Sequence, residues 1–132
     1  MRTYLIVAAG GALGSMARFW LSGAVASRYG ETFPVGTLVV NVSGCFVIGL
    51  LAALTGPEGR WLAPGWFRPF ALVGFLGGYT TFSSFSLQTL TLVQDGDWPG
   101  AAGNVAVSVL FCLAGVWLGA LLGAQLNAPP GS

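Results

Sequence analysis

Lysine and histidine are absent from this 132-residue chain, and charged residues of any kind are rare. Charged residues make up 7% of the sequence and hydrophobic residues 55%, whereas soluble domains carry about one-quarter charged residues. The composition therefore excludes an ordinary soluble domain and indicates an integral membrane protein, and the length predicts a single domain. The arginines form no basic cluster that could neutralise phosphates, so nucleic acid is excluded as a partner.

The residue types that usually carry catalysis or bind transition metals are also scarce. No nucleophile–base pair, carboxylate pair or phosphate-binding loop is visible, so we predict that the protein is not an enzyme. Cys45 and Cys112 lie in apolar runs without histidine nearby, which favours small packing residues over metal ligands or a disulfide. The acids all fall outside the apolar runs: Glu31, Glu58, Asp95 and Asp97.

Four apolar runs are each long enough to cross a bilayer, which takes about 20 largely apolar residues. We expect transmembrane helices over residues 3–26, 33–54, 67–93 and 100–126. The predicted fold class is an all-α membrane protein with one domain over residues 1–127, and residues 128–132 are expected to be a disordered tail. The first run also resembles a cleavable signal peptide, but Arg18 interrupts it and it is too long and glycine-rich for one.

The third run contains a segment, residues 74–86, that is unsuited to a lipid-facing helix. Its paired Gly77 and Gly78 weaken the helix, and several hydroxyl side chains follow at mid-membrane depth. Irregular or polar backbone is tolerated there only where protein buries it or where it lines a polar cavity. Because freed carbonyls and helix ends serve as ligands, we predict a third helix broken at its centre and an intramembrane ion site.

Polar residues on the other predicted helices continue this pattern at helical spacing. They are Thr37 and Asn41 in the second run, Thr81, Ser84, Gln88 and Thr91 in the third, and Asn104 and Ser108 in the fourth. One Ser or Thr can bond its own helix backbone, but an aligned stripe with embedded amides indicates a narrow polar path. The path offers hydroxyl and amide donors and no carboxylate, which favours an anion over a cation.

Two phenylalanines, Phe82 and Phe85, lie beside the stripe and directly after the expected break. The positive edge of an aromatic ring can face an anion, although an ordinary packing role is an equally good interpretation. Small residues repeat every fourth position at Gly10 and Gly14 and again at Gly115, Gly119 and Gly123. This spacing permits close helix contact, either within a subunit or between subunits.

Three motifs together resemble the CrcB-type (Fluc) fluoride channels. They are GGALGSMAR at residues 10–18, GTLVVN at 36–41 and GFLGGYTTFSSFS at 74–86. The resemblance implies a passive channel that exports cytoplasmic fluoride across the cell inner (plasma) membrane. It further implies an antiparallel, dual-topology homodimer with two pores and a central structural sodium ion.

The resemblance also implies roles for individual residues. Together with Ser84 of the polar stripe, the fluoride path is expected to include Phe82, Phe85, Asn41, Thr37, Ser108 and Arg18. The backbone carbonyls of Gly77 and Thr80 are expected to bind sodium, a hard cation that prefers oxygen ligands. The chain departs from the family pattern at Gln88, where members often carry an acid.

Two alternatives remain open on the sequence. A proton-coupled exporter of the small multidrug type needs a carboxylate within the membrane, and none is predicted here. One subunit of a heterodimeric channel is the other alternative. The side of the membrane with both termini and the second loop carries Arg2, Arg60 and Arg68, against Arg28 and, if it reaches that side, Arg18 on the other. So small a bias predicts insertion in both orientations and therefore a homodimer.

Overall fold

The computed structural model describes residues 1–30 and 32–128, and the regular elements in this part of the chain are all helices, joined by loops, with no strand. Four helical segments are long and apolar enough to cross a bilayer. The fold is that of a four-span, all-α membrane protein. Of the tail expected at residues 128–132, residues 129–132 lie outside the described residues.

The first two spans are single helices, α1 (Arg2–Tyr29) and α2 (Val35–Leu54). The third consists of three segments, which are the π-helical η1 (Pro69–Leu76), α3 (Gly77–Tyr79) and α4 (Phe82–Gln94). The fourth is α5 (Trp98–Asn127), whose first turn is capped by the Asp97 carboxylate accepting the Gly100 N–H at 2.9 Å. This cap starts α5 two residues before the apolar run that predicted it.

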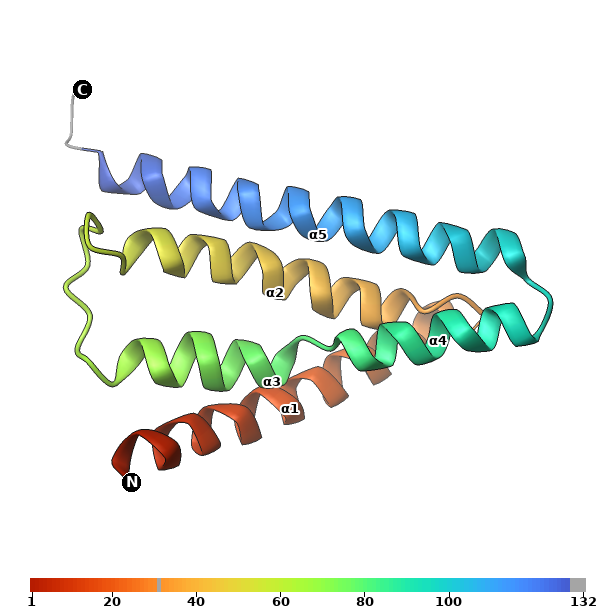
Figure 1. Ribbon diagram of the computed structural model, residues 1–132, viewed down its shortest axis with the longest axis horizontal. Coiled ribbons are helices and arrows are strands. Elements are labelled where there is room, and N and C mark those ends of the chain that lie inside the picture. Colours follow the sequence, from red (N-terminus) through yellow and green to blue (C-terminus); the bar gives the residue numbers. More distant parts are fainter. Residues whose placement is uncertain (31, 129–132) are drawn as a thin grey trace.

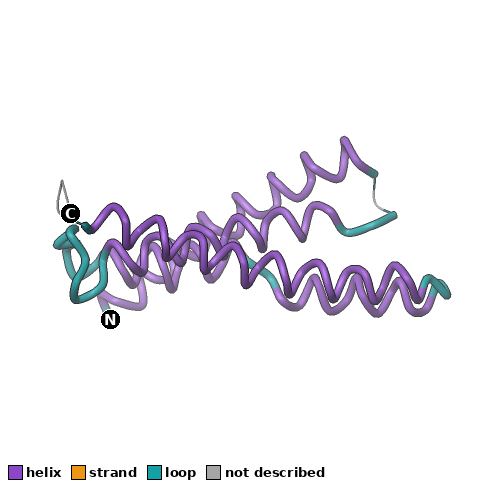
Figure 2. Tube along the Cα trace, turned by 90° about the horizontal axis from the view of Figure 1, so that it is seen from above, coloured by secondary structure: helices purple, strands orange, loops and turns teal. Residues whose placement is uncertain are grey.

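The helices lie roughly along one direction, and both termini are at the same end of the bundle (Figure 1). Two pairings dominate the packing, α2 against α5 and α1 against η1 and α3. Seen from above, the bundle is tight at the end with the termini and divides toward the other end (Figure 2). There the end of α1 and the start of α2 diverge from the α4–α5 pair.

The two glycine repeats pack within the subunit. A Cβ added at Gly14 would overlap the Phe75 carbonyl oxygen of η1, and one added at Gly119 would overlap the Phe46 carbonyl oxygen of α2. Only glycine allows the backbones to approach this closely. Of the two possibilities left open by the spacing, the described structure uses these glycines for contacts between helices of one chain.

The end of the bundle with the termini is held by side chains that bind helix C-terminal carbonyls. The Arg68 guanidinium donates to the Thr55 carbonyl at 3.0 Å, and the Arg60 guanidinium donates to the Leu126 carbonyl at 2.8 Å. Asn127 donates to the Ala53 carbonyl at 2.9 Å. Positive charge at a helix C-terminus complements the helix dipole, so these contacts satisfy the ends of α2 and α5 and tie them together.

Candidate functional site: the interrupted third span and the cavity beside it

The third span is interrupted at Thr80 and Thr81, which lie between α3 and α4. Thr80 has φ −79° and ψ 154°, and Thr81 has φ −149° and ψ 108°, so both residues are extended. Gly77 and Gly78 stay helical, which moves the irregular backbone two to three residues beyond the glycines that suggested it. Gly78 instead permits close packing, because an added Cβ would lie 2.5 Å from the Gly11 carbonyl oxygen of α1.

Asn41 of α2 binds the main chain of the extended segment. Its Oδ1 accepts the Thr81 N–H at 2.7 Å, and its Nδ2 donates to the Thr81 carbonyl at 3.1 Å. One side-chain amide therefore satisfies both backbone groups of a residue that the helix leaves unpaired. A primary amide carries two N–H donors, so Asn41 retains one more for another partner.

Two further α2 residues contact the same segment. The hydroxyl groups of Ser43 and Tyr79 are hydrogen-bonded at 2.8 Å. Gly44 leaves room for Thr80, because an added Cβ would overlap the Thr80 methyl group. Ser43 and Tyr79 were not predicted as site residues, and nothing in their spacing pointed to a contact between them.

The interruption also releases the carbonyls of Gly77 and Thr80. In a continuous helix these would accept the N–H groups four residues later, those of Thr81 and Ser84. The Thr81 N–H donates instead to Asn41, and the Ser84 N–H donates to the Thr81 hydroxyl at 3.2 Å. Side chains have thus taken the donors that these two carbonyls would otherwise bind.

A cavity of about 820 Å³ lies beside the interruption, lined by α1, α2, α4 and the loops at the divided end of the bundle. Arg18, Thr37 and Ser84 line it, as do the other members of the α4 stripe, which are Thr81, Gln88 and Thr91. The two loop acids Asp95 and Asp97 also belong to the lining. The cavity therefore unites most of the polar stripes that the sequence predicted on separate helices.

In the part of the chain that the structure describes, Gln88 places a buried, unpaired side-chain atom beside this cavity. Its Oε1 atom is buried and has no hydrogen-bond partner among the described residues. Buried polar groups nearly always have a partner, from protein or from ordered water. The Gln88 amide is therefore available to a water molecule or to a solute in the cavity.

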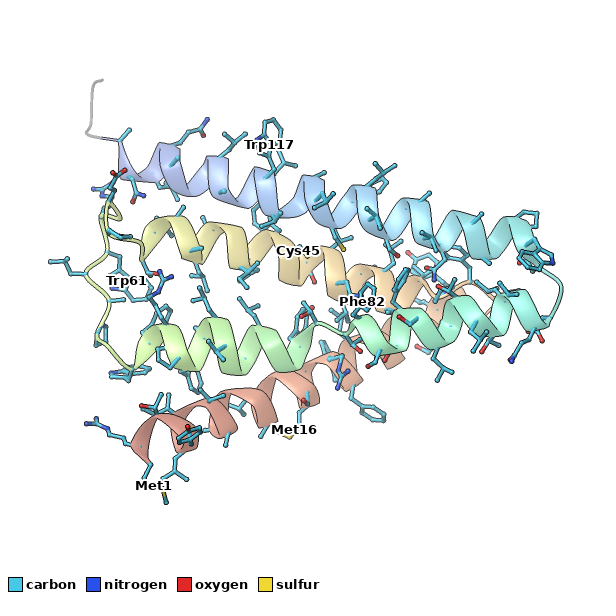
Figure 3. The ribbon with its side chains drawn as sticks, viewed as in Figure 1. Met1, Met16, Cys45, Trp61, Phe82 and Trp117 are labelled. Carbon is cyan, nitrogen blue, oxygen red and sulfur yellow. The ribbon has the colours of Figure 1, made fainter. Side chains whose placement is uncertain are left out.

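The two phenylalanines lie next to each other, with ring centroids 5.2 Å apart, but in different surroundings. Phe85 is 8% exposed, whereas Phe82 is 77% exposed at the start of α4 (Figure 3). Neither lines the cavity. The face that carries Phe82 also exposes Ser83 and Ser86, polar residues in the middle of a span.

Ser108 belongs to a separate network between α4 and α5 and does not line the cavity. Its hydroxyl donates to Oδ1 of Asn104 at 3.4 Å, and Asn104 is only 2% exposed. Asn104 Nδ2 donates to the Thr89 hydroxyl at 2.8 Å, which in turn donates to the Phe85 carbonyl at 2.8 Å. Thr89 was not predicted as a site residue, although its position four residues after Phe85 permits this bond.

A family model described as "CrcB-like protein, Camphor Resistance (CrcB)" matches residues 5–120, which is most of the chain. The chain belongs to the CrcB family. A protein of Rhodospirillum rubrum named "Fluoride-specific ion channel FluC" is 65% identical over 117 residues, which cover 89% of this chain and 91% of that protein. A protein of Opitutus terrae with the same name is 60% identical over 132 residues, the whole of both chains.

These matches confirm the resemblance that the three motifs suggested. CrcB proteins are ion channels and not enzymes, as the sequence predicted. Together with the four helices able to span a membrane, membership of the family makes this chain a multi-pass membrane protein.

Proposed function

We propose that this protein is a fluoride-selective passive ion channel. The observation that carries the proposal is the cavity beside the interrupted span, which is lined by hydroxyl, amide and guanidinium donors. Among the described residues that line the cavity, the carboxylates are those of Asp95 and Asp97, which come from the loop at the open end and not from the spans. The names of the relatives, fluoride-specific ion channels, identify the anion that such donors would serve.

A dehydrated fluoride ion needs replacements for its hydration shell. The Thr37 and Ser84 hydroxyls and the remaining N–H of Asn41 would donate hydrogen bonds to the ion. The Phe82 and Phe85 rings would turn their edges, which are the positive part of the aromatic quadrupole, toward it. Arg18 lines the cavity, so its charge would attract anions toward the path. Ser108 is buried in the described chain, so we assign it to the path on the family pattern alone.

An antiparallel homodimer with two pores is the assembly that we propose. A single chain exposes Phe82, Ser83 and Ser86 next to extended backbone, and the space around Gly77 is open. Irregular backbone does not face lipid within the hydrocarbon region, so protein must cover this face. The small arginine bias permits both orientations, which supplies a second, inverted copy as the cover. A heterodimer with a related subunit is the alternative.

The central sodium ion fits the donor set at the interruption. Carbonyl oxygens suit hard cations, and the Gly77 and Thr80 carbonyls have lost their helical donors to Asn41 and Thr81. Gly77 is exposed on the open face where the second copy would lie. These carbonyl oxygens would hold the sodium ion, whose positive charge would bind the two copies together.

The direction of transport follows from acid–base chemistry. Hydrogen fluoride is a weak, neutral acid that crosses membranes and ionises in a less acidic cytoplasm, where the anion is trapped. A potential that is negative inside drives the anion outward at about 2.3 kcal/mol per charge per 100 mV. A channel in the cell inner (plasma) membrane would therefore export fluoride without coupling to an energy source.

The test is ion efflux from liposomes that contain the purified protein. Liposomes loaded with potassium fluoride should release fluoride to an electrode when valinomycin is added, and liposomes loaded with potassium chloride should release far less chloride. Protein-free liposomes serve as the control. Fluoride release equal to that of the protein-free control, or equal release of both halides, would refute the proposal.

A further inference from the structure

We propose that Asn41 is a positioning residue that keeps Thr81 out of the helix and thereby makes the Gly77 carbonyl available to a cation. This inference rests on the proposed channel and its sodium ion. It gives Asn41 a second role besides donating a hydrogen bond to fluoride.

The first step is the geometry of the Asn41 amide. Its Oδ1 and Nδ2 atoms bind the N–H and carbonyl of the same residue, Thr81, at 2.7 and 3.1 Å. A planar amide that binds both groups matches an extended residue, as a neighbouring strand would, and Thr81 is extended at φ −149° and ψ 108°. Thr81 is also buried, at 7% exposure, and among the described residues Asn41 is the partner of both its N–H and its carbonyl.

The second step is what Thr81 would do without that partner. The last helical bond before the interruption joins the Thr80 N–H to the Leu76 carbonyl at 3.0 Å. The next bond in the series would join the Thr81 N–H to the Gly77 carbonyl. An unpaired buried N–H is costly, so removal of the Asn41 amide favours rewinding by one residue. Rewinding would occupy the oxygen assigned to sodium.

The third step separates Asn41 from its neighbours on α2. Ser43 contacts the same segment, but only through the Tyr79 side-chain hydroxyl. Loss of the Ser43 hydroxyl leaves the Thr81 main chain with its partner. Ser43→Ala is therefore a matched control that removes one α2 contact to the segment and should leave the Gly77 carbonyl free.

Fluoride flux does not discriminate between the two roles of Asn41, because either role predicts that flux falls. Sodium affinity does discriminate between them, because a residue that only donates a hydrogen bond to fluoride should not change the affinity for sodium. Asn41→Leu removes both contacts to Thr81. Asn41→Asp keeps an oxygen that accepts the Thr81 N–H, so it should preserve the free Gly77 carbonyl while impairing the fluoride path.

The experiment is a sodium titration of the thermal stability of the purified dimer, with N-methylglucamine replacing sodium at constant ionic strength. If the segment is rewound in part of the molecules, the apparent affinity for sodium falls in proportion to the fraction that can still bind it. We expect Asn41→Leu to raise the half-saturating sodium concentration about tenfold, a factor that corresponds to about 1.4 kcal/mol. Ser43→Ala should stay within about twofold of the wild type, and Asn41→Asp should not raise the midpoint.

The wild-type arm reports on the sodium proposal alone. If the thermal stability of the wild-type dimer does not change with sodium concentration, both the structural sodium ion and this inference are overturned. A sodium-dependent wild type with the same midpoint in Asn41→Leu would overturn only the inference. If Asn41→Leu yields no dimer, Asn41→Ser replaces it, because a serine hydroxyl is too short to bind both Thr81 groups. An unchanged midpoint in that variant refutes the inference equally.

Discussion

The hydrogen bond between Asn104 and Thr89 should couple the position of α4 to α5, and a double-mutant cycle can measure that coupling. Thr89→Val is nearly isosteric and deletes the hydroxyl that accepts from Asn104 Nδ2 at 2.8 Å. Asn104→Leu deletes the amide at a position that is 2% exposed. The double variant replaces both polar groups with apolar ones of similar shape.

The three variants should differ in stability in a defined order. Thr89→Val leaves the buried Asn104 amide without its partner, which costs about 1–3 kcal/mol in proteins generally. We expect about 1 kcal/mol here, because polar contacts between membrane helices average only about 0.6 kcal/mol. Asn104→Leu should cost less, since the Thr89 hydroxyl keeps its bond to the Phe85 carbonyl. The double variant should cost less than the sum, because neither partner of the Asn104–Thr89 bond is then left unpaired. The Ser108 hydroxyl loses its Asn104 acceptor in Asn104→Leu and in the double variant alike, so that loss cancels in the cycle.

Fluoride efflux should depend more on whether a variant keeps the Thr89 hydroxyl than on how stable the variant is. The hydroxyl joins Asn104 to the carbonyl of Phe85, the residue whose ring is proposed to face the ion. Thr89→Ser keeps the hydroxyl and should retain most of the flux, whereas the stable double variant should lose part of it. Thermal denaturation and liposome efflux measured on the same preparations provide both quantities. Additive stability changes, or full flux in the double variant, would refute the coupling.

Three other predictions concern the phenylalanines, the glycine packing and the topology. Phe82→Ile and Phe85→Ile should each greatly reduce fluoride efflux while the dimer still purifies, because isoleucine keeps apolar bulk but has no quadrupole; near-normal efflux in both would remove the aromatic role. Gly14→Ala should destabilise the protein by about 1–3 kcal/mol through overpacking against η1, whereas Gly103→Ala, which meets no atom within 4 Å, should be tolerated in the same thermal assay. Reporters fused to the carboxyl terminus should be found on both faces of the membrane, and a strictly one-sided result would favour the heterodimer.

The four spans could be predicted because apolar length is a local property of the sequence. Each long run without acids became a helix able to cross a membrane. The ends were less predictable, since caps such as Asp97 and partners such as Arg68 act through individual contacts. The π-helical hydrogen bonding of η1 was not predicted, and no residue pattern in that segment marks it.

The place of the interruption shows where local reasoning ends. Gly77 and Gly78 have the lowest helix propensity in the segment, apart from proline, yet both are helical. The extended residues are Thr80 and Thr81, and the partner that satisfies Thr81 is Asn41, which lies 40 residues earlier. Helix propensity identified a segment where the helix is weak, but the residue at which the helix is interrupted is the one that binds Asn41.

The glycine repeats illustrate the same limit for helix partners. Their spacing shows that a helix has a face suited to close contact, but spacing alone does not identify the neighbour. In the structure Gly14 meets η1 and Gly119 meets α2, both in the same chain. The surface that we propose for a second copy carries Phe82, Ser83 and Ser86. Of these three residues, the sequence had placed only Phe82 on the ion path.

The two ends of the bundle differ in a way that bears on how an antiparallel pair would work. At one end Asn127 joins α5 to α2, and Arg60 and Arg68 bind the carbonyls at the ends of α5 and α2. At the other end the helices diverge (Figure 2), and the cavity lies there. A parallel pair would place both open ends on one side of the membrane. An inverted pair would present one open end and one tied end on each side, so an ion could approach from either face. The same arginines that fasten the tied end also make up most of the charge bias, and a larger bias would fix one orientation. We therefore expect few arginines at that end beyond those that bind the carbonyls at the ends of α2 and α5.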